Sequence, residues 1–402
     1  MTSEWHEVPL RELVGYISKG IAPSYAEEAS ETTIRVLNQK CNRNFRISYG
    51  DSRLHDTLKK KVPPERYVKP DDILINSTGA GTAGRIAQIE DVPSATTIDG
   101  HMILIRSNGK VTQKFLGYAL KAHQWEVLQL DEGSTGQTEL NRDRLLDEIM
   151  INYPVSFDEQ NAIVGTLESI DRKLIVNKEI NDNLEQQAEL LYHERFETID
   201  RDKLPVGWRI VRLGDVATIS KKSFNPAKEP EMLLEHYSIP AFDEAHFPVF
   251  EPSTAIKSNK FIVDDSCFMI SKLNPTTKRV WKPYCLTENA VCSTEFIVYK
   301  AKSQEITDFL YSVIDSDSFS DFMCSHVTGS TGSRQRTTPS DTLAFELVLP
   351  NAEEIAEYQG IVSPMLEQIK CNAIENDRLK RLRDSLLPKL MSGEIDVSDI
   401  QL

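Results

Sequence analysis

Two long stretches of the chain carry apolar residues at alternating spacings of four and three, which is the pattern of a helix that packs along one side. They cover 158–197 and 355–390, and capping sequences precede them at Ser156-Phe-Asp-Glu159 and Asn351-Ala-Glu-Glu354. The pattern predicts two long helices. Their apolar stripes consist of Ile163, Leu167, Ile170, Leu174, Leu184, Ala188 and Leu191 in the first, and of Val362, Met365, Ile369, Leu379, Leu386 and Leu390 in the second.

Polar residues interrupt both stripes. Asparagine in the seam between two helices lowers stability but restricts their register. The first helix has 4 basic and 10 acidic residues over 158–197, whereas the second has 6 basic and 4 acidic residues over 360–390. We therefore predict that the two helices pair as an antiparallel coiled coil; the alternative is that each packs separately on its own domain. The register positions are Asn177, Asn181, Asn372 and Asn376.

The remainder of the chain shows short apolar runs bounded by Gly, Pro, Asn and Asp, which is typical of strands. Each half opens with a strand-like segment (8–19; 211–220), continues through a long divergent stretch, and closes with a helical pattern (114–130; 305–324) and a last apolar strand (149–153; 343–349). Between them lie further predicted strands at 73–77, 85–90 and 102–106 in the first half, and at 267–271 and 295–300 in the second.

The two halves repeat one another. Trp5 to Glu12 matches Trp208 to Asp215, and Gly133-Ser-Thr-Gly136 recurs as Gly329-Ser-Thr-Gly332, in each case with a Pro 18 residues after the last Gly. Several matches in one order predict a tandem duplication. The fold class is α+β, with two tandem repeats, each a mixed α/β domain followed by a long helix. The predicted segments are 1–155, 156–200, 201–350 and 351–402.

Composition limits the class of protein. The chain has 402 residues, 40% of them hydrophobic, which is enough for two domains. No apolar stretch is long enough to span a membrane, and the first residues do not resemble a secretory signal. The six cysteines form no Cys-x-x-Cys pair, which argues against a structural zinc site and favours a reduced, cytoplasmic protein.

The net charge of −15 does not exclude a nucleic-acid partner. Residues 151–200 alone carry 4 basic and 11 acidic residues, while 34–69 carry 10 basic and 3 acidic ones. Lys, Arg, Asn and Gln contact base edges and phosphates in DNA complexes. The candidate DNA contacts are Asn38, Lys40, Arg43, Arg46, Thr78, Arg85, Ser134, Thr135 and Gln137 in the first half, and Lys272, Asn274, Lys278, Arg279, Lys282, Ser330, Thr331, Arg334 and Arg336 in the second.

Gly79-Ala-Gly-Thr-Ala-Gly84 has the spacing of a dinucleotide-binding loop. Such a loop requires a helix after the glycines, whereas 85–90 is predicted to be a strand. We therefore expect a strand–turn–strand loop, and an enzyme with a Rossmann-like site at Gly79–Gly84 is the alternative. No motif for ATP hydrolysis, methyl transfer, metalloprotease or serine hydrolase chemistry occurs in the sequence, so no catalytic residue and no metal ligand is assigned.

With these features the chain resembles the specificity subunit of type I restriction–modification enzymes. The resemblance rests on the Asp71-Asp-Ile-Leu-Ile run with its Gly-Arg85 turn, on the sequence from Gly133 to Pro154, on Asp158 to Val164, and on the ending Leu386 to Glu394. It covers nearly the whole chain. The second half departs from the family by lacking a glycine turn at 272–282, so which bases it reads stays open.

The resemblance implies two target-recognition domains that each read half of a split site in double-stranded DNA, with the paired helices as spacer. It also implies two copies of an adenine methyltransferase subunit and an ATP-dependent restriction and translocation subunit as partners. S-adenosylmethionine, ATP and Mg would be bound by those partners, and none of them by this chain. An orphan or phage-borne recognition protein is a second alternative.

Overall fold

The computed structural model describes residues 4–79, 81–132, 139–229, 231–328 and 335–397, which pack into two compact units. The first unit comprises 1–172 and 380–402, and the second comprises 173–379. Both long helices contribute to both units. Each unit thus combines one β-rich domain with part of each helix.

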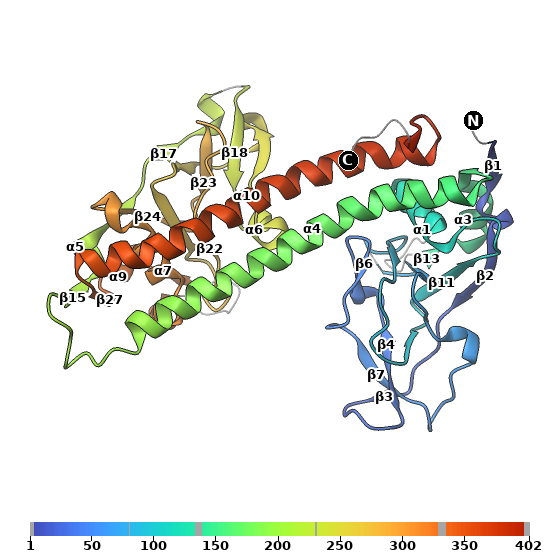
Figure 1. Ribbon diagram of the computed structural model, residues 1–402, viewed down its shortest axis with the longest axis horizontal. Coiled ribbons are helices and arrows are strands. Elements are labelled where there is room, and N and C mark those ends of the chain that lie inside the picture. Colours follow the sequence, from blue (N-terminus) through green and yellow to red (C-terminus); the bar gives the residue numbers. More distant parts are fainter. Residues whose placement is uncertain (1–3, 80, 133–138, 230, 329–334, 398–402) are drawn as a thin grey trace. The chain divides into compact units, whose positions relative to one another are not determined.

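The predicted long helices are α4 (Phe157–Tyr192) and α10 (Ala352–Met391), shown in green and red in Figure 1. Their predicted caps are confirmed, because the Ser156 hydroxyl accepts from Glu159 N (3.4 Å) and the Asn351 amide oxygen accepts from Glu354 N (2.9 Å). The first helix differs from prediction at its end, where residues His193–Glu197 form a π-helical turn. None of the predicted stripe residues is exposed.

In the first unit, β1 (Trp5–Pro9) pairs antiparallel with the last strand, β14 (Met150–Pro154). The central sheet has the order β2-β11-β8-β9 and is antiparallel throughout; a second sheet has the order β10-β4-β7-β3, in which β10 and β4 are parallel. The bounds are β2 Val14–Lys19, β11 Met102–Ser107, β8 Ile73–Asn76, β9 Ile86–Gln88, β10 Thr96–Ile98, β4 Thr33–Leu37, β7 Arg53–Asp56 and β3 Tyr25–Ala26.

Smaller elements complete the first unit. The helices are α1 (Gln113–Ala122), α2 (Gln124–Val127) and α3 (Arg142–Glu148), with 3-10 turns at Leu10–Glu12, Gln39–Cys41 and Pro64–Arg66. Two short hairpins, β5 (Asn42–Arg43) with β6 (Arg46–Ile47) and β12 (Asp131–Glu132) with β13 (Glu139–Leu140), project from the sheets.

The second unit repeats this plan. Strand β15 (Arg209–Arg212) pairs with β27 (Glu346–Leu349), and the central sheet has the order β16-β24-β21-β22. The second sheet gains a fifth strand, in the order β17-β20-β23-β18-β19, and again contains one parallel pair, β18 with β23. The strand bounds are β16 Ala217–Ser220, β24 Phe296–Ala301, β21 Cys267–Ser271, β22 Val280–Trp281, β17 Ser223–Phe224, β20 Lys260–Ile262, β23 Ala290–Ser293, β18 Leu233–Tyr237, β19 Val249–Pro252, β25 Val327–Thr328 and β26 Arg336–Thr337.

The helices of the second unit are α5 (Leu213–Val216), α6 (Ile239–Ala245), α7 (Thr307–Asp315), α8 (Asp317–Ser325) and α9 (Pro339–Thr342), with 3-10 turns at Pro226–Lys228, Ser253–Ala255 and Gln304–Ile306. Helices α7 and α8 divide the predicted helix 305–324, because Ser316 leaves the helical conformation and caps α8 by accepting from Phe319 N. The predicted helix 114–130 is also divided, at His123, although that side chain does not cap α2. The opening segments are also divided, each into two strands by one helical turn.

Each unit buries its core against both long helices. In the first unit, Ile163 and Leu167 of α4 and Leu390 of α10 belong to the same cluster as the central sheet. In the second unit, the corresponding cluster contains Tyr358 and Val362 of α10, together with Ala188, Tyr192 and Phe196. The predicted α+β fold with two repeats and paired helices is confirmed.

A buried ion pair replaces apolar packing at one point of the first unit. The Asp72 carboxylate accepts from Arg106 Nε and Nη2, both at 2.7 Å, and its side chain is 3% exposed. In the second unit a related pair joins Lys300 to Asp264, the first rather than the second carboxylate of the repeated Asp-Asp sequence. The Lys300 and Asp264 side chains are more exposed than those of Arg106 and Asp72, so only the pair of the first unit is enclosed by protein.

We predict that Asp72→Asn lowers the free energy of unfolding by about 3–5 kcal/mol, because it leaves the Arg106 guanidinium largely buried without its counter-charge. Chemical denaturation followed by circular dichroism measures this effect. The matched control is Asp147→Asn, which breaks an equally bidentate but exposed pair with Arg11 and should have little effect. Equal losses in the two variants would contradict the prediction.

Candidate nucleic-acid interface

A turn and a small hairpin lie together in both units, at the end of the central strand. In the first unit Leu140 N donates to Ser77 O (2.8 Å), and in the second Thr337 N donates to Lys272 O (3.1 Å). The hairpins β12–β13 and β25–β26 are thereby joined to the turns that follow β8 and β21. The two repeats thus present the same backbone arrangement with different side chains.

In the first unit this arrangement is polar and internally bonded. Thr78 Oγ1 lies 2.8 Å from His101 Nδ1, and Asn76 Nδ2 donates to the carbonyl of Gln39 at 3.1 Å. The fully buried Asn42 stabilises this arrangement, because its amide donates to Asn76 Oδ1 and to the carbonyl of Arg85. The sequence prediction included Thr78 but not His101 or Gln39.

The hairpin β5–β6 carries the first predicted basic cluster. Asn44 and Phe45 at its tip both have positive φ (53° and 62°), as a two-residue type I′ turn requires. Arg43 is exposed, whereas Arg46 pairs with Glu90 at 3.2 Å. The hairpin therefore presents Arg43 at the surface.

The other predicted DNA contacts of the first unit differ in how far hydrogen bonds within the protein hold their side chains. The Asn38 side chain accepts from Lys40 N and donates to Asp51 O, both at 2.8 Å, so it stabilises its own turn. Lys40 is exposed, and Arg85 donates to the carbonyl of Gly81 at 3.2 Å. Assignment of these residues to DNA contact stays a prediction.

The second predicted cluster is held by carboxylates. Lys278 pairs with Glu189 (2.7 Å), Arg279 pairs with Asp243, and Lys282 pairs with Asp308. Glu189 belongs to α4, so Lys278 joins the β-rich domain of the second unit to the helix. These ion pairs count against a role of Lys278 and Lys282 in base contact, which stays untested.

Lys272, Asn274 and Arg336 lie at the hairpin of the second unit. Lys272 N donates to the carbonyl of Glu295 (2.9 Å), and Asn274 adopts a positive φ of 50°. Arg336 forms a two-point contact with Glu295, from Nε to Oε2 (3.0 Å) and from Nη2 to Oε1 (3.2 Å). The sequence analysis did not include Glu295 or His101 among the candidate site residues. The two correspond in the repeat, because each directly precedes one of the matched strands that begin at 296 and 102.

Six predicted residues lie outside the described part of the chain. They are Ser134, Thr135, Gln137, Ser330, Thr331 and Arg334.

The glycine-rich turn does not form a dinucleotide site. Strands β8 and β9 are antiparallel neighbours, so the residues after Gly84 form a strand where a Rossmann-like site needs a helix. Gly79, Gly81 and Gly84 all have positive φ, and a Cβ on Gly84 would lie 2.9 Å from the Val127 carbonyl oxygen. The glycines serve a strand–turn–strand loop, and the Rossmann-like alternative is wrong.

The predicted register residues meet between the helices. Within the second unit, Asn177 Nδ2 donates to Asn376 Oδ1 (3.0 Å) and Asn372 Nδ2 donates to Asn181 Oδ1 (2.8 Å). The order of these contacts makes α4 and α10 antiparallel, as Figure 1 also shows. Positions 177 and 372, and 181 and 376, correspond in the repeat, so the two contacts are related by a pseudo-two-fold axis. Their role in setting the register stays a prediction.

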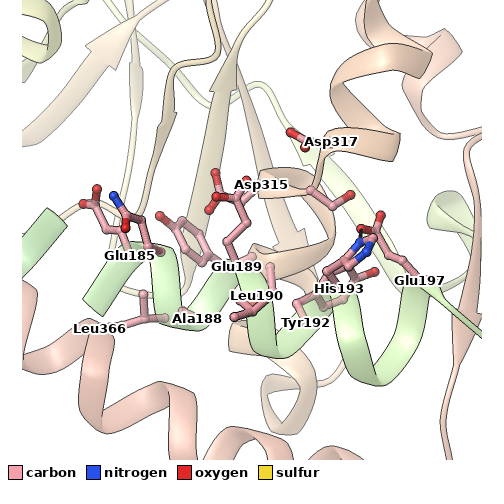
Figure 2. Close-up of a pocket in the computed structure, with 14 residues that line it drawn as sticks. Glu185, Ala188, Glu189, Leu190, Tyr192, His193, Glu197, Asp315, Asp317 and Leu366 are labelled. Carbon is pink, nitrogen blue, oxygen red and sulfur yellow. Dashed lines mark hydrogen bonds and ion pairs between the residues drawn. The ribbon is translucent and has the colours of Figure 1, made fainter. Parts of the chain in front are cut away.

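An acidic hollow of about 270 Å³ lies where α4 meets the start of α8 in the second unit (Figure 2). Glu185, Glu189, Asp315 and Asp317 contribute carboxylates to it, and Lys278 contacts Glu189 and Asp315. Burial, helped by the charges of Asp315 and Asp182, raises the pKa of Glu185 to about 7. Burial also raises the pKa of Asp315. These shifts predict that the contact between α4 and the domain of the second unit depends on the protonation of Glu185 and Asp315.

No group of three His, Cys, Asp or Glu side chains among the described residues has the arrangement of a metal site. Among the described helices, none has a sufficiently long apolar stretch to cross a bilayer.

Comparison with known proteins bears on both units. Residues 2–186 match the family model described as the type I restriction modification DNA specificity domain. The chain is 25% identical over 381 residues to the type I restriction enzyme MjaIX specificity subunit of Methanocaldococcus jannaschii, with 88% of this chain and 84% of that protein aligned. It is 33% identical over 92 residues to the HindI specificity subunit of Haemophilus influenzae, which is 23% of this chain and 20% of that protein.

One solved structure supports the fold. The S subunit of a type I restriction–modification system from M. genitalium superposes with a TM-score of 0.61 at 14% identity. The alignment covers 97% of this chain and 96% of that one. The similarity therefore extends over both repeats.

We predict that Asn376→Leu alone destabilises the protein by about 1–3 kcal/mol, whereas Asn177→Leu combined with Asn376→Leu is neutral or stabilising. The single change removes one of the two acceptors of the Nδ2 of the fully buried Asn177, the other being Glu375 Oε2 at 2.7 Å, and Asn177 Oδ1 already lacks a hydrogen bond. The double change replaces both asparagines by apolar side chains, and Glu375 keeps its contact with Lys173. Thermal unfolding of the two single variants and the double variant measures the coupling. Additive effects would show that the asparagines do not act as a pair.

Glu185 makes stability pH-dependent. Its folded pKa of about 7 exceeds the unfolded value of about 4.3, so the folded state binds this proton more tightly and loses stability as pH rises between these values. His246, 3.8 Å away, does not offset this loss, because burial lowers its pKa to about 4.

We therefore expect Glu185→Gln to raise the melting temperature at pH 8 and to change it little at pH 4. The control is Glu179→Gln, an exposed position on the same helix. A Glu185→Gln effect that is equal at both pH values would contradict the assignment.

Proposed function

We propose that the chain is the DNA sequence-specificity subunit of a type I restriction–modification complex, because it is similar to the type I restriction modification DNA specificity domain over 2–186 and to a type I specificity subunit over 88% of its length. One structural observation supports this proposal beyond the similarity. The two repeats share a backbone scaffold and differ in the side chains around the turn and hairpin, which is what a protein that reads two different half-sites requires.

Each recognition domain reads one half of a split site in double-stranded DNA. Side chains from the exposed turns contact base edges, and cations anchor the phosphates. The recognition domains are close to electrically neutral, with 19 basic and 21 acidic residues over 1–150 and 17 basic and 19 acidic residues over 201–350. We therefore expect weak binding of DNA by the isolated chain and a shallow dependence on salt.

The paired helices act as the spacer between half-sites and as the docking surface for partners. In this proposal α4 and α10 bind two copies of an adenine methyltransferase subunit, and an ATP-dependent restriction and translocation subunit joins the complex. S-adenosylmethionine, ATP and Mg belong to those subunits. This chain supplies recognition and no catalytic group.

We predict that methylation depends on this chain in a host that carries the matching methyltransferase gene. With the chain present, methylome sequencing should find methyladenine at one bipartite motif with a constant spacer; without it, that motif should be unmethylated, because the methyltransferase lacks sequence recognition. Arg43→Ala should relax the motif in its first half only.

The control is the same host with the methyltransferase gene alone. Methylation of the motif in that host, or methyl transfer by the purified chain alone, would overturn the proposed function. Methylation that requires both genes would also distinguish this protein from an orphan recognition protein, because an orphan protein would not direct the methyltransferase to any motif.

A further inference from the structure

An exposed arginine and an exposed tyrosine lie against each other at the edge of the second sheet of the first unit. Arg53 begins β7 and Tyr25 begins β3, two neighbouring strands drawn in blue in Figure 1. The guanidinium carbon of Arg53 lies 3.4 Å from the centre of the Tyr25 ring, and Tyr25 is 39% exposed. The two side chains therefore form a stacked pair at the surface of the protein.

This stacking restricts the plane of the guanidinium without using its N–H donors. The Tyr25 ring contacts the flat face of the group, whereas the five N–H bonds of an arginine lie in its plane. Among the described residues, Arg53 forms no hydrogen bond and no ion pair. A neutral partner thus orients the planar set of donors, and no carboxylate of the described chain occupies it.

Arg53 lies at the same end of the sheet as residues already considered for DNA contact. It faces Val36 in the register of the sheet, so it is level with the ends of the parallel strands β4 and β10. Asn38, directly after β4, donates from Nδ2 to the carbonyl of Asp51 (2.8 Å), two residues before Arg53. His101 follows the end of β10 by three residues. The stacked pair therefore belongs to the edge of the domain that carries the polar turn.

The second unit has a different side chain at the equivalent position. Its parallel pair β18–β23 corresponds to β4–β10, and the strand beside β18, β19, corresponds to β7. Arg53 faces Val36, the second of three residues of β4 that pair with β10, and Val249 faces His236, the second of three residues of β18 that pair with β23. Val249 therefore takes the place of Arg53, and it is 46% exposed. Among the described strands β19 is at the edge, so none corresponds to β3.

This difference favours contact with a base over contact with a phosphate. The phosphate backbone is the same in every sequence, so a phosphate anchor at this place would serve both half-sites equally. Contacts with bases, in contrast, must differ between two half-sites of different sequence. Arginine donates to O6 and N7 of guanine in the major groove, whereas an apolar side chain contacts the methyl group of thymine.

We propose that Arg53 reads a guanine in the half-site bound by the first unit, and that Tyr25 is the positioning residue that holds its guanidinium. This inference rests on the proposed function and names the base pair that one side chain recognises. The second unit, with Val249 at the equivalent position, does not read guanine from that position.

The test uses the intact complex of this chain with its methyltransferase. After methylome sequencing of the wild-type host, duplexes are prepared in which each base pair of both half-sites is replaced in turn, and methylation rates on these duplexes are compared. The variants are Arg53→Ala, Arg53→Lys, Tyr25→Ala and Tyr25→Phe. The controls are Val249→Ala and Lys59→Ala, which removes an exposed cation beyond the other end of β7, and thermal unfolding checks that all variants fold.

For Arg53→Ala we expect the preference for G·C at one position of the first half-site to fall by roughly 5- to 150-fold, with all other positions unchanged. Arg53→Lys should lose most of this preference, since an ammonium group lacks the planar pair of donors. Tyr25→Ala should relax the same position less strongly, whereas Tyr25→Phe should keep the preference, because phenylalanine supplies the same ring face. Lys59→Ala should leave every position unchanged, and Val249→Ala should leave the first half-site unchanged.

Other outcomes overturn the proposal. For Arg53→Ala these are an unchanged motif, a uniform loss of methylation on all duplexes, as the loss of a phosphate contact would cause, or a change in the second half-site. Equal effects of Tyr25→Ala and Tyr25→Phe would overturn the positioning role of the ring. In each of these cases the wild-type complex still methylates its bipartite motif, so the proposed function stands. Only a wild-type chain that directs methylation to no motif would remove both.

Discussion

Neither unit can complete its hydrophobic core with one repeat alone. The first β-rich domain packs on Ile163 and Leu167 at the start of α4 and on Leu390 near the end of α10, while the second packs on Tyr358 and Val362 at the start of α10. The second core also contains Tyr192, the last residue of α4, and Phe196 of the π-helical turn that follows it. Because each domain needs the beginning of its own helix and the end of the other, the two helices must run antiparallel.

This constraint separates the parts of the molecule that must stay alike from those that can differ. The apolar positions that contact the helices recur in both repeats, since both cores have the same shape to fill. The turn and hairpin at the end of the central strand are joined by backbone hydrogen bonds, which place no demand on side-chain identity. His101 can therefore be exchanged for Glu295, and Glu139, which bridges Thr78, for Arg336, which bridges Leu273, without altering the scaffold.

Polar groups buried at the contacts of the long helices lower the stability of the protein, but they restrict which residues can meet there. Asn177 is fully buried, and its Oδ1 has no hydrogen-bond partner, which an apolar residue would avoid. The carboxylates of Glu189 and Asp315 both contact Lys278, and burial raises the pKa of Asp315 and of the nearby Glu185. In the first unit the corresponding contact is better balanced, because Asp171 meets both Lys121 and Arg383 at 3.0 Å.

The sequence by itself determined the long helices, their caps, the repeat and the α+β class, because these depend on local spacing of apolar residues and on neighbouring residues that cap the helices. It also favoured a strand–turn–strand loop over a Rossmann-like site at Gly79–Gly84, since a strand pattern follows Gly84, and the antiparallel pairing of β8 with β9 then excluded that site. Only the tertiary structure decided which charged residues have partners. Lys278 and Lys282 read as a basic cluster along the chain, but Glu189 and Asp308, distant in sequence, lie against them. For the same reason Glu295 was missed: its significance comes from Arg336, which the hairpin brings to it from 41 residues away.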